Sequence, residues 1–160
     1  METGTEILKK ILHHEVKASA FYTLASEITH NDESRMLFLE LADMEEGHAK
    51  SIADQVRDTH FTSGFDPYAF IEELESTVET TLRNDTTGIL LDGEMADVLK
   101  MAISMEETAF EAYKLMANKA EDPEVKAFCE KQAEEEKGHK QQLLQLLTSL
   151  DMDEEERPDL

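Results

Sequence analysis

Hydrophobic residues recur at helical spacing in four long stretches of the chain, with polar residues between them. Apolar positions every three to four residues indicate a helix with one buried face. The first two stretches cover about 5–28 and 32–57, and the other two cover about 93–121 and 122–150. A short polar turn separates the members of each pair. The pattern therefore predicts two antiparallel helical hairpins.

Residues typical of helix starts precede three of these stretches. Thr3 and Glu6 have the spacing of a capping box, in which each side chain bonds the other's backbone. Asn31 or Asp32 can cap the second helix, since both residue types are favoured N-caps. The Asp-Pro pair at 122–123 supplies a cap followed by proline at the first helical position. The predicted boundaries thus have a local physical basis.

The segment between the hairpins, about 61–92, has a weaker pattern. Polar and glycine-containing runs at 62–64 and 84–88 predict turns. Between them, the Asp-Pro pair at 66–67 and apolar residues at helical spacing predict a connecting helix. A connection of this length can run along a bundle as a crossover. We expect one four-helix bundle over residues 1–150 and an acidic, frayed tail over 151–160.

Composition narrows the class of protein. The 160 residues include 6 Gly, 3 Pro and no Trp, and strong helix formers dominate, which predicts an all-α fold. The net charge of −22 opposes binding to nucleic acid or anionic membranes. A single cysteine, Cys129, allows neither an internal disulfide nor a four-cysteine metal site. No signal peptide or apolar stretch of about 18 residues is found, so we expect a cytoplasmic protein without membrane association.

One short sequence occurs twice and gives the chain an internal repeat. The copies are Glu45-Glu46-Gly47-His48 and Glu136-Lys137-Gly138-His139. Their offset is constant, because 136 − 45 and 139 − 48 both give 91. The same offset superimposes two more pairs: Glu15 on Glu106, and Tyr22 on Tyr113. Each half therefore supplies a Glu, a Tyr seven residues later, and a Glu-x-x-His.

The repeated acidic residues lie on the apolar faces of their helices. Glu15 and Glu45 are equidistant from the turn of their hairpin, and so are Glu106 and Glu136. Four carboxylates should therefore meet at one level of the bundle, with no lysine or arginine at nearby core positions. Four unpaired buried carboxylates would be very costly. Two divalent ions would balance them, and oxygen with imidazole ligands suits iron, manganese or zinc.

The six residues resemble the ligand set of the ferritin-like di-iron carboxylate proteins. The chain looks most like the rubrerythrin branch, in its forms without a rubredoxin domain. The resemblance implies six metal ligands: Glu15, Glu45, His48, Glu106, Glu136 and His139. It implies that Glu45 and Glu136 bridge two metals. It also implies that Glu15 with His48, and Glu106 with His139, complete one metal each.

The resemblance further implies that Tyr22 and Tyr113 donate hydrogen bonds to ligand carboxylates. Two features depart from the rubrerythrin pattern. Ala109 replaces the usual extra Glu one turn after the third-helix ligand, and these 160 residues contain one cysteine, too few for the cysteine-rich electron-transfer module. We therefore expect the reductant to be a separate partner.

The leading hypothesis is a non-haem di-iron oxidoreductase that reduces hydrogen peroxide or dioxygen. It would use two iron ions, with manganese or zinc as alternatives, and a separate electron donor; the resemblance favours a homodimer. A ferroxidase, iron-storage or iron-handling protein is the first alternative. A non-catalytic, metal-stabilised interaction domain is the second.

The remaining conspicuous residues have structural interpretations. Gly47 and Gly138 weaken their helices, so we expect them to permit close packing against a neighbouring helix. Cys129 and the methionines should fill the core. The other four histidines lie off the repeated pattern and should face solvent: His13, His14, His30 and His60.

Overall fold

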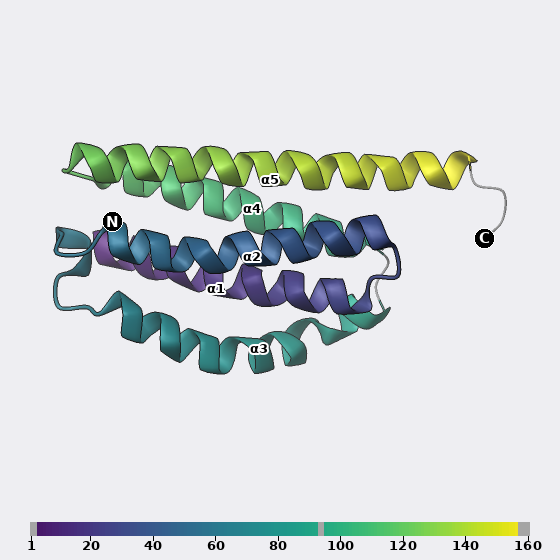
Figure 1. The fold of residues 1–160 in the computed structure, drawn as a ribbon, viewed down its shortest axis with the longest axis horizontal. Coiled ribbons are helices and arrows are strands. Elements are labelled where there is room, and N and C mark those ends of the chain that lie inside the picture. Colours follow the sequence, from purple (N-terminus) through teal and green to yellow (C-terminus); the bar gives the residue numbers. More distant parts are fainter. Residues whose placement is uncertain (1–2, 93–94, 157–160) are drawn as a thin grey trace.

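The computed structural model describes residues 3–92 and 95–156, and this part of the chain is all-α (Figure 1). It contains five α-helices and one short 3-10 helix. In chain order these are α1 (Gly4–Ile28), α2 (Asp32–Gln55), η1 (His60–Thr62), α3 (Pro67–Asp92), α4 (Met95–Lys119) and α5 (Pro123–Glu156). The predicted fold class is confirmed.

Four of the helices form the bundle, and the fifth crosses it. Helices α1 and α2 make one antiparallel hairpin, and α4 and α5 make the other (Figure 1). Helix α1 packs beside α4 as well as α2, which brings the two hairpins together. Helix α3 runs along α1 and carries the chain from the end of the first hairpin to the start of the second (Figure 1). The predicted crossover is thereby confirmed.

The predicted helix caps are present. The Thr3 hydroxyl accepts from the Glu6 N–H at 3.1 Å, and the Glu6 carboxylate accepts from the Thr3 N–H at 2.8 Å. The Asn31 side chain accepts from the Ser34 N–H at 3.0 Å. These bonds satisfy backbone donors that the first helical turn leaves without partners. They position the starts of α1 and α2, the two helices of the first hairpin.

Two predicted boundaries differ from the structure. The run at 84–88 was predicted to be a turn, but it lies within α3, which continues to Asp92. Helix α5 continues past Leu150 to Glu156. Extending a helix costs far less than starting one, so a short run of turn-forming residues can still continue an existing helix. The division of the chain at residue 150 stays a prediction.

The hydrophobic core has two parts along the bundle. On α1, Ile7 to Val16 contribute to one part, and Ala18 to Ala25 contribute to the other. Glu15 lies near the junction of the two. The apolar parts therefore close both sides of the level at which the repeated carboxylates lie. Cys129 is fully buried in the first part, as predicted.

Two other packing predictions are wrong. Met36 is 68% exposed, because the buried stripe of α2 passes instead through Ser34, Phe38 and Leu41. At Gly47 and Gly138, an added Cβ would meet no heavy atom within 4 Å. Close packing against a neighbouring helix therefore does not explain these two glycines.

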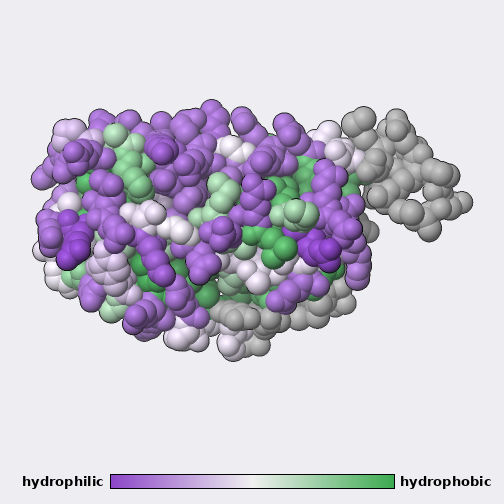
Figure 2. All heavy atoms as spheres, in the orientation of Figure 1, coloured by the Kyte–Doolittle hydropathy of each residue, from purple (hydrophilic) through white to green (hydrophobic). Residues whose placement is uncertain are grey.

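Hydrophilic side chains cover most of the face shown in Figure 2, with smaller hydrophobic areas between them. Within residues 3–92 and 95–156, none of the helices combines the length and apolar content needed to cross a membrane.

Candidate metal centre

Four acidic side chains, one from each bundle helix, are completely buried. They are Glu15 of α1, Glu45 of α2, Glu106 of α4 and Glu136 of α5, each with 0% exposure. Acidic residues are almost never fully buried unless they are paired. Their burial follows from the helical period, which places each of them on the apolar face of its helix.

The imidazole of His48 lies against three of these carboxylates. Its Nδ1 atom is 3.1 Å from Glu136 Oε1, 3.4 Å from Glu15 Oε2 and 3.6 Å from Glu45 Oε2. The nearest contact is thus with the opposite hairpin. His48 belongs to the first hairpin, so this contact joins α2 to α5.

His139 repeats the arrangement from the other side. Its Nδ1 atom is 3.0 Å from Glu45 Oε1 and 3.6 Å from both Glu106 Oε2 and Glu136 Oε2. The rings of His48 and His139 are nearly parallel, with centroids 6.1 Å apart. Glu45 and Glu136 therefore approach both imidazoles, which is the placement that bridging ligands need. Their bridging role stays a prediction.

The two tyrosines connect the hairpins in a reciprocal way. The Tyr22 hydroxyl donates to Glu106 Oε1 at 2.6 Å, and the Tyr113 hydroxyl donates to Glu15 Oε1 at 2.9 Å. Burial and the adjacent carboxylates raise the pKa of both tyrosines well above the ordinary value, so both keep their protons. Each tyrosine thereby fixes one oxygen of a buried carboxylate on the opposite hairpin.

The four carboxyl groups differ in protonation when no metal is bound. Burial and the neighbouring carboxylates raise the pKa of Glu15 well above its usual value, and burial likewise raises the pKa of Glu106. Burial also opposes ionisation of Glu45 and Glu136, but hydrogen bonds from their neighbours outweigh it. The pKa of Glu45 is well below its usual value, and that of Glu136 falls to about 2.

The histidines supply the compensating charge. Burial alone would lower the pKa of His139, but its carboxylate contacts outweigh burial and raise this pKa to about 12. Contacts with Glu136, Glu15 and Glu45 raise the pKa of His48 in the same way. Two imidazolium groups then balance the charge of two carboxylates. In the metal-free centre, bound protons therefore supply the positive charge that metal ions would otherwise provide.

One oxygen of each buried carboxylate is left without a hydrogen bond. The Oε2 atoms of all four Glu residues are buried and have no hydrogen-bond partner in the described part of the chain. Unpaired buried acceptors are costly, and metal coordination would satisfy them. Oxygen and imidazole donors fit iron, manganese or zinc. The residues present therefore fit a dinuclear centre.

Among the residues that the structure describes, two overlapping groups of donors are compact enough to hold an ion. One consists of His14, Glu15, Glu45 and Glu136, and the other consists of Glu45, Glu106, Glu136 and His139. In each group the donor atoms lie within 4.8 Å of one another. Glu45 and Glu136 belong to both groups.

A comparison with family models agrees with this geometry. The model described as Rubrerythrin matches residues 6–85 and 97–159, which is most of the chain. The chain belongs to the rubrerythrin family. The family match confirms the resemblance drawn from the repeated motifs, and the helical bundle is the ferritin-like fold that it implied. No curated protein and no solved structure matches the chain.

The family assignment supports a di-iron type of protein, and the matched segments contain all six predicted ligands. Ala109 lies buried one turn after Glu106, so α4 brings a methyl group where rubrerythrins usually have a further carboxylate. The centre of this rubrerythrin-family chain therefore receives one buried carboxylate from each bundle helix.

Sequence reasoning missed His14. His13, His30 and His60 are exposed as predicted, but His14 is partly buried beside the carboxylates. The 91-residue repeat could not reveal it, because Met105 occupies the equivalent position in the second half. Its position next to Glu15 was the available signal.

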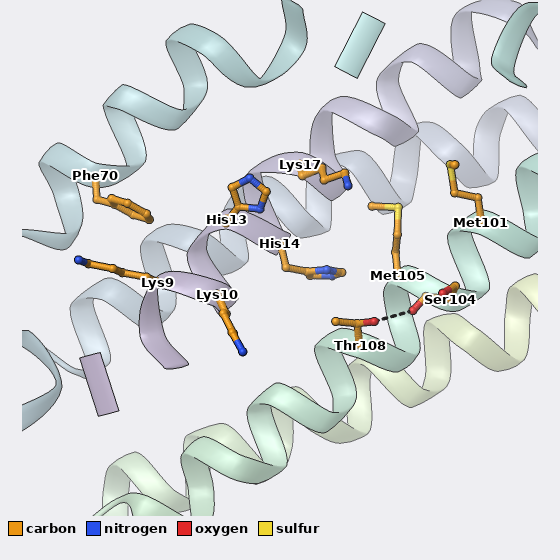
Figure 3. A pocket seen from close by; sticks show the side chains of 10 residues that line it. All are labelled: Lys9, Lys10, His13, His14, Lys17, Phe70, Met101, Ser104, Met105 and Thr108. Carbon is orange, nitrogen blue, oxygen red and sulfur yellow. Dashed lines mark hydrogen bonds between the residues drawn. The ribbon is translucent and has the colours of Figure 1, made fainter. Parts of the chain in front are cut away.

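An open cavity of about 900 Å³ lies between α1, α3 and α4 and reaches His14 (Figure 3). Its α1 side carries Lys9, Lys10, His13, His14 and Lys17. The α4 side is neutral, with methionine, serine and threonine side chains. His14 belongs to both the cavity wall and the carboxylate group, so the cavity ends beside the centre.

Proposed function

We propose that this protein is a rubrerythrin-like non-haem di-iron oxidoreductase that reduces hydrogen peroxide or dioxygen. The observation that carries the proposal is the group of four fully buried carboxylates, each with one unpaired oxygen, beside two imidazoles. Unpaired buried acceptors are costly, and bound metal would satisfy all four of these oxygens.

Iron bound there would supply the electron transfer to the oxidant. The protein's own residues would do the rest. The carboxylates would hold the two ions close together and neutralise them, as in other two-metal sites. Tyr22 and Tyr113 would keep Glu106 and Glu15 in fixed orientations through their hydrogen bonds. The two parts of the apolar core would exclude water on either side.

Reduction of one hydrogen peroxide to two waters consumes two protons and two electrons. A separate electron donor would supply the electrons, and we propose a homodimer as the working form. Iron is the proposed metal, with manganese and zinc as alternatives. The cytoplasmic location stays a prediction.

The cavity favours an oxidant over iron as the substrate that enters from solvent. Its α1 wall carries Lys9 and Lys17, whose positive charges would disfavour a ferrous ion but not peroxide or dioxygen. Iron handling by a ferroxidase requires repeated entry of cations, so this wall opposes that alternative. A purely structural metal site is the remaining alternative.

Anaerobic titration of metal-free protein with ferrous iron tests the proposal, followed by divided addition of peroxide or air. We expect saturation at two ions per chain, oxidation by at least one oxidant, and re-reduction without iron loss. Continued uptake of iron after oxidation would contradict the proposal and support iron storage. Two bound ions that neither oxidant changes would support the structural alternative.

A further inference from the structure

The internal repeat is broken at two positions that touch the centre. His14 in the first half corresponds to Met105 in the second, since 105 − 14 is 91. Glu135 in the second half corresponds to Met44 in the first, since 135 − 44 is also 91. In each pair one residue is a polar donor or acceptor and the other is a thioether. The two halves of the centre therefore cannot be chemically equal.

His14 lies on the Glu15 side of the centre. One of its ring nitrogens lies within 4.8 Å of donor oxygens of Glu15, Glu45 and Glu136. Its Nε2 atom is buried and has no hydrogen-bond partner among the described residues. An imidazole with a buried, unpartnered nitrogen atom beside three carboxylates is placed to act as a ligand.

The second difference between the halves, Glu135 in place of a methionine, also affects the Glu15 and His48 side of the centre. His48 directs Nδ1 at the carboxylates, and its Nε2 atom is 3.1 Å from Glu135 Oε2. A carboxylate on the outer nitrogen of a histidine ligand fixes the ring and makes the inner nitrogen more basic. The Nε2 atom of His139 is buried without a partner in the described chain, and the position equivalent to Glu135 is Met44.

We propose that the two metal positions are unequal, and that His14 is an additional ligand of the position formed by Glu15 and His48. This position takes the first ion and holds it more tightly. The position formed by Glu106 and His139 has Met105 and Met44 in place of the two polar groups, so it fills second. The inference rests on the proposed dinuclear centre and adds a ligand and an order of binding to it.

Calorimetric titration of the metal-free protein with Zn²⁺ tests the inference without redox chemistry. We expect two binding steps in the wild type. His14→Ala should weaken the first step by about tenfold or more and bring the two steps closer together. Two matched controls are Met105→Ala, the equivalent position of the other half, and His13→Ala, an exposed neighbour; neither should change the first step by more than about twofold.

A crystal of the wild type with one Co²⁺ per chain gives the position directly. We expect anomalous density at the Glu15 and His48 position, within bonding distance of a ring nitrogen of His14. His14→Gln, which preserves bulk without an imidazole, replaces His14→Ala if the latter fails to fold. The Met105→His variant should strengthen the second step by restoring the repeat.

The outcomes separate this inference from the proposed function. Two zinc ions bound with equal affinity in the wild type, and unchanged in His14→Ala, would overturn the inference but keep the dinuclear centre. First occupancy at the Glu106 and His139 position would overturn it as well. Failure of the wild type to bind zinc between Glu45 and Glu136 would overturn both.

Discussion

At the scale of single residues, Glu45 and Glu136 differ from Glu15 and Glu106 in how many imidazoles they meet. Each of the first two lies within 3.6 Å of both His48 and His139. Within the described residues, Glu15 contacts His48 but not His139, and Glu106 contacts His139 but not His48. We therefore predict different consequences when a side chain of each kind is removed.

We expect Glu45→Ala and Glu136→Ala each to weaken the binding of both ions, because a bridging carboxylate serves two metals. Glu15→Ala and Glu106→Ala should each weaken mainly one ion and act as matched controls. Metal titration of the four variants gives the number of tight sites in each. Two tight ions in either Glu45→Ala or Glu136→Ala would show that the bridging assignment is wrong.

The sequence predicted the six clustered Glu and His residues because they repeat at a fixed offset. The same offset indicated the tyrosines, whose hydrogen bonds to Glu106 and Glu15 are present. His14 escaped because it has no histidine counterpart and lies one residue from the predicted stripe. A repeat identifies the residues that the two halves share. A functional residue that occurs in only one half, such as His14, can be identified only from the three-dimensional structure.

At the scale of the helix, the repeated glycines are a local weakness without a packing reason. An added Cβ at Gly47 or Gly138 would meet no heavy atom within 4 Å. Alanine is favoured over glycine in a helix interior by about 1 kcal/mol. Gly47→Ala and Gly138→Ala should each raise the melting temperature of the metal-free protein by about 2–4 °C.

Gly4→Ala is the matched control, because a Cβ there would lie 2.8 Å from the ring of Phe61, which is buried. We expect this variant to melt at a lower temperature than the wild type. Thermal unfolding followed by circular dichroism measures all three variants. A lower melting temperature in Gly47→Ala would mean that the glycine is needed for a shape that the packing distances do not reveal.

The sequence predicted which segments form helices, but it did not predict every helix boundary. Local caps such as Thr3 and Asn31 set helix starts through bonds within one turn, so the sequence identifies them. The run at 84–88 has turn-forming residues, yet it lies inside α3. Its conformation depends on the helix that reaches it and on the need to cross the bundle, which are properties of the whole fold. The exposure of Met36 likewise depends on which neighbouring helices are present.

At the scale of the whole molecule, the centre should make stability fall with rising pH when no metal is bound, and metal should remove this dependence. The raised pKa values of Glu15, Glu106, His48 and His139 mean that the metal-free fold retains protons that the unfolded chain has lost. For such groups, stability is highest at low pH and is lost as the pH rises above the unfolded values.

We therefore expect the metal-free protein to lose stability as the pH rises from about 6 to about 9, by at most about 1.4 kcal/mol per pH unit for each retained proton. The lowered pKa values of Glu45 and Glu136 give their stabilisation above about pH 4.5 and add no slope in this range. Metal replaces protons, so the loaded protein should not show this loss.

Denaturant unfolding across this pH range, with and without Zn²⁺, measures both slopes. Filling the centre should also release protons, at most one from each of these four groups, which unbuffered titration can count. A metal-free protein that becomes more stable between about pH 6 and 9 would contradict the assigned protonation.

We expect two metal ions to lie side by side between Glu45 and Glu136. Crystals grown from protein loaded anaerobically with ferrous iron, measured on both sides of the iron absorption edge, test it most directly. We predict two anomalous peaks about 3.5–4 Å apart, one beside Glu15 and His48 and the other beside Glu106 and His139. A single peak, or iron bound only at the acidic surface, would contradict the account.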